Sequence, residues 1–170
     1  MELDLFLGRF HPVVVHLPIG FIVLAVIIES IGLFKKDRQI YNRIVQYALI
    51  AVIVSSLITV ATGLLLSQGG EYNAETLSQH KWLGIGVAVY SILALVLKRK
   101  IPNYDRKHSM IISSLFIILV GLTGHQGGVL THGEEYLLTY APDAIKNMAG
   151  FEIADSKKGI QLKNQDSILI

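Results

Sequence analysis

Four long apolar stretches, almost free of charged residues, constrain this chain more than any other feature of its sequence. Each reaches or nearly reaches the ~20 residues that a helix needs to cross a hydrocarbon core of ~30 Å. Soluble helices of this length would need a polar face, and residues 44–66 offer only Gln46, Tyr47 and a few Ser and Thr. We therefore predict four transmembrane helices rather than a large soluble helical core. The stretches are Val13 to Phe34, Ile44 to Ser67, Trp82 to Leu97, and Ser109 to Gly124 with an extension to Leu130.

The composition agrees with a membrane protein and limits the chemistry. Of the 170 residues, 52% are hydrophobic and only 16% are charged, unlike an ordinary soluble domain. The sequence has no cysteine, which excludes disulfides, thiolate metal sites and covalently attached c-type haem within these residues. Any metal or cofactor must be held by other groups.

Two basic clusters predict how the helices cross the membrane. Residues 35–43 and 98–107 together hold nine of the 15 Lys and Arg residues. By the positive-inside rule these loops face the cytoplasm, which places both termini and residues 68–80 on the outer side of the membrane, the periplasmic side if the membrane is a bacterial inner membrane. Short loops make neighbouring helices antiparallel, so we expect an all-α, up-down-up-down four-helix bundle in the lipid bilayer. Because the basic runs flank membrane spans, we expect no nucleic acid partner.

The composition changes near residue 134. Residues 1–134 are predicted to form the four-helix transmembrane module, and no internal repeat is evident in them. Residues 135–170 are predicted to be an extracytoplasmic short helix, starting near Ala141-Pro142-Asp143, followed by a polar linker that includes residues 157–164. The apolar residues 167–170 predict a further extracytoplasmic region beyond them.

Five of the six histidines are expected near the periplasmic face. Counting 1.5 Å per residue from the basic clusters places His16, His80 and His125 about 28, 27 and 26 Å above the cytoplasmic boundary. These three imidazoles, on three helices, are therefore predicted to share one layer, with His11 and His132 in a second layer farther out. A kink at Pro18 could shift His16 by several ångströms.

A layer of imidazoles in a helical bundle is typical of b-type haem. Haem b needs two axial nitrogens on opposite faces of the macrocycle, an apolar slot, and room for its propionates near water. We expect His16 and His80 to ligate a first haem, with His125 as the competing ligand. His11 and His132 are expected to hold a second haem or to line the entrance.

Other residues near the periplasmic face fit the same interpretation. Arg9 and Lys81 lie where they could pair with haem propionates. The glycines of the fourth stretch would let a flat ligand or another backbone approach closely. They are Gly121, Gly124, Gly127 and Gly128.

Several alternatives remain open from the residues alone. A zinc or copper ion could be held by three of His16, His80, His125 and His132, with Glu134 or Glu135 completing the site. Single histidines can also be interfacial anchors or helix caps, and the glycine-rich residues 124–128 can be a helix stop. Glu29 is expected to pair with a Lys or Arg at the cytoplasmic interface, although a role in proton relay or quinone contact is the alternative. The small residues of the second stretch, Ser55, Ser56, Thr59, Thr62 and Gly63, predict a packing surface.

Three motifs carry a resemblance to a known family. LGRFHPVVVHLPIG at residues 7–20, HKWLGI at 80–85 and TGHQGGVLTHGEEYL at 123–137 resemble an uncharacterised bacterial four-helix membrane module that commonly precedes a planctomycete-type cytochrome c domain. The resemblance covers roughly residues 3–142, and the tail at 149–170 is similar to the linker into that domain. It implies association with redox domains, and it identifies five motif histidines: His11, His16, His80, His125 and His132.

The resulting functional hypothesis is a membrane electron-transfer module with one or two b-type haems. It would pass electrons between the quinone pool and an extracytoplasmic partner, such as a fused or docked c-type cytochrome domain. Since no acid, base or nucleophile constellation is present, we expect an electron carrier or anchor subunit rather than a stand-alone enzyme. The rivals are a cofactor-free anchor for a periplasmic cytochrome or enzyme domain and a histidine-based metal-binding membrane protein. The small-residue faces are compatible with a homo-oligomer.

Overall fold

The computed structural model describes residues 2–100, 106–133 and 135–148, and all regular structure in these ranges is helical. The chain divides into two compact units, residues 1–127 and 128–170. The sixth helix runs from the first unit into the second. The division falls seven residues before the boundary expected from composition.

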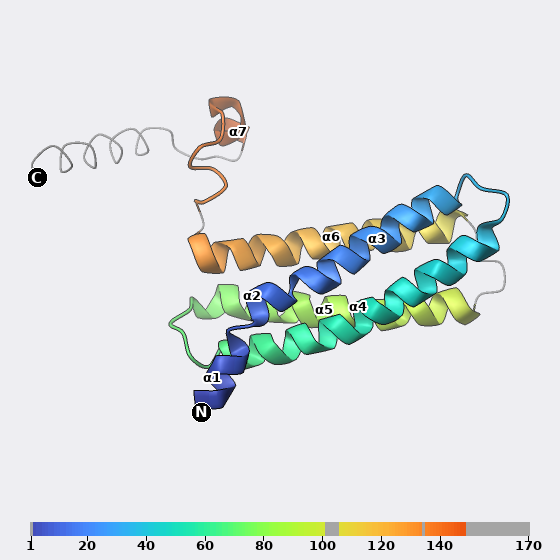
Figure 1. Cartoon of the computed structure of the whole chain (residues 1–170). Helices are drawn as coiled ribbons and strands as arrows, with labels where there is room; N and C mark the ends of the chain where they lie inside the picture. The colour runs from blue at the N-terminus through green and yellow to red at the C-terminus, as the bar shows by residue number, and fades with distance from the viewer. Residues whose placement is uncertain (1, 101–105, 134, 149–170) are drawn as a thin grey trace, which may run out of the picture. The chain divides into compact units, whose positions relative to one another are not determined.

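The first unit contains four spans. The first span consists of three consecutive helices, α1 (Glu2–Gly8), α2 (His11–Val14) and α3 (His16–Gly32). It is followed by α4 (Arg38–Leu66), α5 (Ala74–Lys100) and α6 (Arg106–His132), which run side by side with α3 (Figure 1). All four spans are long and apolar enough to cross a membrane. The predicted all-α architecture of four transmembrane helices is confirmed.

Proline interrupts the first span at Val15. Pro18 has no N–H to donate to the carbonyl of Val14, and its ring clashes with that carbonyl in a regular helix. Accordingly α2 ends at Val14 and α3 begins at His16. The hydroxyl of Thr59 on α4 donates to the Ser55 carbonyl at 2.8 Å and also lies 3.5 Å from the freed carbonyl of Val14. The second span thus covers the break in the first.

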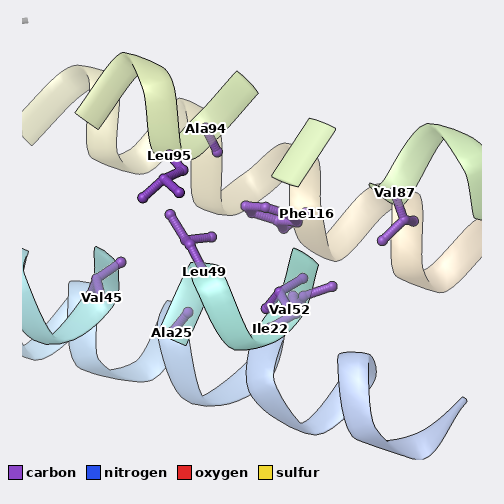
Figure 2. Packing of buried hydrophobic residues seen from close by; sticks show 9 residues of the cluster. All are labelled: Ile22, Ala25, Val45, Leu49, Val52, Val87, Ala94, Leu95 and Phe116. Atoms are coloured by element: carbon purple, nitrogen blue, oxygen red, sulfur yellow. The ribbon is translucent and has the colours of Figure 1, made fainter. Parts of the chain in front are cut away.

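The core of the first unit draws on α3, α4, α5 and α6 (Figure 2). Most other large apolar side chains on the spans are exposed, as expected where lipid covers the helices. The packing surface predicted on α4 is present, since Ser55, Ser56 and Thr59 are buried. The buried apolar side chains are Ile22, Ala25, Val45, Leu49, Val52, Val87, Ala94, Leu95 and Phe116.

Helix α6 is the least buried of the four spans. Its buried residues are Ser109 and Phe116, and the Phe116 ring packs edge-on against Tyr90 with centroids 4.7 Å apart. The Tyr90 hydroxyl donates to the carbonyl of Ile112 at 3.1 Å. Few backbone atoms of α6 closely approach another helix, so side chains provide most of its attachment.

The glycine-rich end of the fourth span is helical. Helix α6 continues through Gly124, Gly127 and Gly128 to His132, which confirms the longer extension and contradicts a helix stop at residues 124–128. The helix ends before Gly133, whose φ of 90° is a left-handed conformation that glycine adopts without strain.

The second unit includes α7 (Asp143–Met148), which follows Pro142 and confirms the predicted helix start. The amino group of Lys146 donates to the carbonyl of Thr139 at 3.1 Å and ties this helix to the preceding turns. The predicted linker at residues 157–164 lies outside the described residues.

Candidate functional site

Two histidines meet inside the first unit. His11 lies on α2 and His80 lies on α5, and their ring centroids are 6.2 Å apart with an interplanar angle of 88°. Both side chains are partly buried. They lie at the end of the bundle opposite the start of α4 at Arg38 and the basic end of α5. We call these the histidine end and the basic end.

Each imidazole is held by the second helix of its own hairpin. Nδ1 of His11 lies 3.0 Å from the carbonyl oxygen of Thr59 on α4. Because a carbonyl can only accept a hydrogen bond, this contact requires the proton on Nδ1. A Cβ at Gly63, four residues after Thr59, would lie 2.9 Å from Cε1 of His11. The missing side chain therefore makes room for the ring beside the carbonyl.

His80 has the same surroundings in the second hairpin. Its Nδ1 lies 3.0 Å from the carbonyl oxygen of Thr123 on α6. Gly127, four residues after Thr123, would carry a Cβ only 3.1 Å from Cε1 of His80. Both sites thus use a Thr carbonyl as acceptor and a Gly one helical turn later as the space for the imidazole.

This arrangement determines which nitrogens can act as ligands. With the proton on Nδ1, a neutral ring has its lone pair on Nε2, and a backbone acceptor at Nδ1 fixes the tautomer as it does for many metal-binding histidines. Two imidazoles bound to one metal through bonds of about 2.0–2.1 Å have ring centroids roughly 6 Å apart when their nitrogens face each other. The separation of 6.2 Å between His11 and His80 matches that value.

The other predicted ligands lie elsewhere. The structure places His11, not His16, against His80; His16 is exposed at the start of α3. His125 is exposed on α6, so the expected layer of His16, His80 and His125 is not formed as a cluster. In the second unit, exposed His132 lies 2.6 Å from the Thr131 hydroxyl, and its ring lies 4.3 Å from that of Tyr136.

Of the charged residues and glycines predicted to assist haem binding, only some lie near the two imidazoles. Arg9 and Lys81 are exposed, and the Lys81 amino group lies 5.7 Å from the centre of the Trp82 ring. Gly127 contacts His80, whereas a Cβ at Gly121, Gly124 or Gly128 would meet no described atom within 4 Å. Across the part of the chain that the structure describes, no three His, Asp or Glu residues are grouped to hold a metal ion. Glu135 is exposed, and Glu134 lies outside the described residues.

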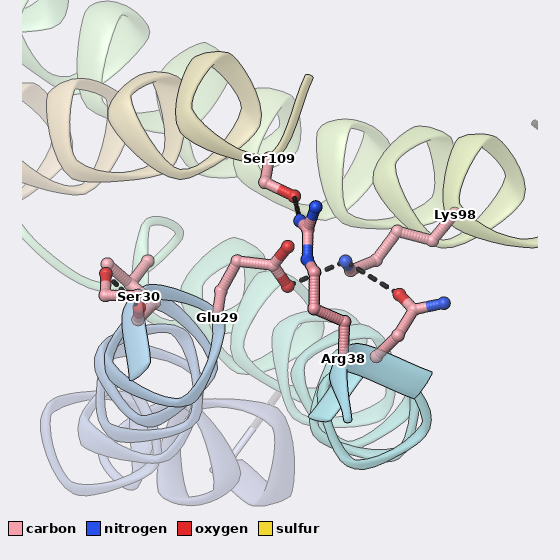
Figure 3. Close-up of polar contacts among 7 residues, drawn as sticks. Glu29, Ser30, Arg38, Lys98 and Ser109 are labelled. Atoms are coloured by element: carbon pink, nitrogen blue, oxygen red, sulfur yellow. Dashed lines mark hydrogen bonds and ion pairs between the residues drawn. The ribbon is translucent and has the colours of Figure 1, made fainter. Parts of the chain in front are cut away.

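A buried ion pair lies at the basic end. The Lys98 amino group on α5 is 2.7 Å from Oε2 of Glu29 on α3, and it donates to Oδ1 of Asn42 on α4 at 3.0 Å (Figure 3). The two charged side chains are only 2% and 10% exposed. Nearby, Arg38 donates to the Ser109 hydroxyl at 3.3 Å and so connects α4 with α6. The prediction that Glu29 pairs with a basic residue is confirmed.

The fold and the site define a polytopic helical membrane protein with paired imidazoles at one end and a buried ion pair at the other. The chain belongs to the family described as Predicted membrane protein (DUF2231), whose model matches residues 9–135. The matched region includes both imidazoles and both of their Thr–Gly acceptor sites. No curated protein and no solved structure matches the chain.

Sequence reasoning missed the groups that hold the imidazoles. Thr59 and Gly63 were assigned to packing, and Thr123 was given no role. The available signal was the pattern Thr-x-x-x-Gly, which occurs near the end of the second span at residues 59–63 and of the fourth at 123–127.

Proposed function

We propose that the chain is a membrane electron-transfer module that binds b-type haem through His11 and His80. The observation that carries this proposal is the matched pair of rings, 6.2 Å apart, each with Nδ1 at a backbone carbonyl. Neutral imidazoles in this tautomer direct a lone pair from Nε2, which is the donor that haem iron takes from histidine.

The surrounding residues fit a large planar group better than a lone metal ion. A structural zinc ion uses four protein ligands and a catalytic one uses three, whereas the described residues offer two imidazoles in contact and no third histidine or carboxylate grouped with them. Haem iron needs only two axial ligands, because the porphyrin supplies the rest. On α6, near His80, Gly121 and Gly124 add no side chain that would obstruct a macrocycle.

Each named residue has one task in this proposal. The Thr59 and Thr123 carbonyls keep the proton on Nδ1 and orient the two rings. Gly63 and Gly127 let the imidazoles lie against α4 and α6. Lys81, exposed next to His80, could neutralise a propionate. When bound, a haem with both axial positions filled by imidazole supplies one-electron transfer rather than oxygen chemistry.

The proposal also includes an orientation. The basic residues at the start of α4 and the end of α5 favour a cytoplasmic position for the basic end in a bacterial inner membrane. The histidine end and both termini would then be periplasmic, where a c-type cytochrome domain could exchange electrons with the site. Quinone would be the partner within the membrane.

An optical spectrum of the detergent-purified protein tests this function. We expect Soret and α bands in the reduced protein after expression with sufficient haem, and the loss of these bands when His11 or His80 is replaced by Ala. A colourless protein that contains stoichiometric zinc or copper would support the metal-binding alternative. A folded protein without haem or metal would support the cofactor-free anchor and reject the electron-transfer proposal.

A further inference from the structure

We propose that the first unit consists of two helical-hairpin repeats, residues 11–63 and 80–127, related by an approximate two-fold axis along the bundle. The first and third spans follow this axis, and α6, which packs less closely on its neighbours than α4 does, departs from it most. We further propose that Glu29 and Lys98 are the device that makes the two repeats pair with each other. This inference concerns the assembly of the module and does not depend on the ligand of the histidine pair.

The first and third spans carry matching positions. His11 and His80 are 69 residues apart and have the same surroundings, and Glu29 and Lys98 are separated by the same 69 residues. Between these two pairs, the same offset relates each buried residue of α3 to a buried residue of α5. These mates are Pro18 and Val87, Ile22 and Ser91, and Ala25 and Ala94.

The second and fourth spans match at a separate offset. Thr59 and Thr123, the two imidazole acceptors, are 64 residues apart, as are Gly63 and Gly127. With this offset, each buried residue of α6 corresponds in sequence position to a buried residue of α4. Ser109 corresponds to Val45, and Phe116 corresponds to Val52.

Contacts between residues at corresponding positions of the two repeats, called mates here, locate the two-fold axis. Helices α3 and α5 run in the same direction through the bundle, and a two-fold axis parallel to them brings mates face to face at the same depth. This is observed at both ends, where His11 meets His80 and Glu29 meets Lys98 at 2.7 Å. The equal separation shows that the first and third spans lie in register, and the matching Thr carbonyls on the second and fourth spans extend the correspondence to both hairpins.

The ion pair makes the two repeats different in charge, because the first buries a carboxylate and the second an ammonium group at the corresponding position. Two copies of the first hairpin paired in this way would bury Glu29 against itself, and two copies of the second would bury Lys98 against itself. Like charges buried without a partner are strongly unfavourable, whereas unlike charges at hydrogen-bond distance compensate each other. The pair therefore favours association of one repeat with the other over association between copies of the same repeat.

Charge exchange in the full-length chain tests this assignment. Glu29→Lys and Lys98→Glu should each lower the Tm in detergent by roughly 10 °C or abolish the monodisperse species, since each leaves two like charges in contact. The double exchange Glu29→Lys with Lys98→Glu should recover at least half of the lost Tm, because the axis makes the two positions interchangeable. A double variant as unstable as the worse single variant would overturn the proposal.

An uncharged exchange provides a second test if the charge variants do not fold. Ile22 and Ser91 are 1% and 0% exposed, and the axis places them face to face. Ile22→Ser should be destabilising, and adding Ser91→Ile should restore most of the Tm by returning the lost volume to the same layer. The matched control combines Ile22→Ser with Ser56→Ile, at another buried serine, and should give no recovery. Equal behaviour of the two double variants would contradict the repeat, whatever the spectrum shows about haem.

Discussion

Gly63 lies so close to His11 that a Cβ at this position would come within 2.9 Å of the imidazole Cε1. The second span therefore contributes to the histidine site by the absence of a side chain, while the carbonyl one turn earlier holds the ring. The same relationship links Gly127 with His80. Substitutions that add one methyl group can thus separate the role of ring position from that of fold stability.

The first prediction concerns this methyl group. Gly63→Ala should displace the His11 ring and weaken its bond to the Thr59 carbonyl, while alanine gains about 0.5–1 kcal/mol in a helix. We expect little change in Tm but a loss of haem affinity of roughly tenfold or more, as for other residues that orient a ligand. Haem titration of the purified protein measures this effect. Gly20→Ala on α3, where a Cβ meets no described atom within 4 Å and which has no role in the proposed site, is the control and should leave haem affinity unchanged.

The second prediction compares the motif histidines. Replacing His11 or His80 by Ala should remove the Soret and α bands to the same extent, because the two rings have equivalent surroundings. Exposed His16 and His125 should tolerate the same change with spectra close to those of the unmodified protein. Loss of the bands in the His16 and His80 variants, with retention in the His11 variant, would reinstate the pairing expected from depth alone.

The third prediction addresses the packing of α1. A Cβ at Gly8 would lie 2.5 Å from the backbone nitrogen of Leu66 at the end of α4. Since backbone cannot move aside as a flexible side chain can, Gly8→Ala should cost roughly 1–3 kcal/mol. Thermal unfolding in detergent measures this loss. Gly20→Ala has open space around the new methyl group and should not lower the Tm.

The fourth prediction addresses the attachment of α6. Tyr90→Phe removes the donor to the Ile112 carbonyl but keeps the ring against Phe116, so it should cost about 0.5–1.5 kcal/mol. Because α6 has few other buried contacts, we expect faster hydrogen exchange in α6 than in α4 of this variant. Tyr47→Phe, at a side chain that is 72% exposed, should change neither quantity.

The fifth prediction concerns orientation. These 170 residues contain no cysteine, so a single thiol introduced into them reports one position. With Lys36→Cys, a membrane-impermeant maleimide should label the thiol only after the cells are opened. With Glu71→Cys, intact spheroplasts should be labelled directly. The reverse pattern would invert the proposed topology.

The spans could be predicted from sequence because the hydrocarbon core imposes a minimum length on apolar runs. Glu29 could be assigned to an ion pair because an intramembrane carboxylate requires a partner. The pairing of His80 could not be obtained by counting residues along ideal helices. Lys98 pairs with Glu29 and so does not lie level with Lys35, six residues later; counting from these two lysines therefore placed His16, not His11, beside His80.

The carbonyl groups that accept hydrogen bonds from the two imidazoles could not be predicted from the sequence for a different reason. The Thr59 and Thr123 carbonyls are backbone atoms, which every residue has, and only the glycine one turn later makes them accessible to an imidazole. A pattern of two residues in each span does not stand out in an apolar sequence. It gains meaning once both sites are seen to hold the same kind of ring.

The interruption at Val15 also makes the two repeats mechanically different. His80 and Lys98 lie on one unbroken helix, so a rotation or tilt that starts at the imidazole reaches the ammonium as a rigid-body movement. His11 and Glu29 lie on separate helical segments, and motion of α2 can be absorbed at the joint before it reaches the carboxylate. We therefore expect a movement of the imidazole to be transmitted to the charged side chain more completely along the third span than along the first.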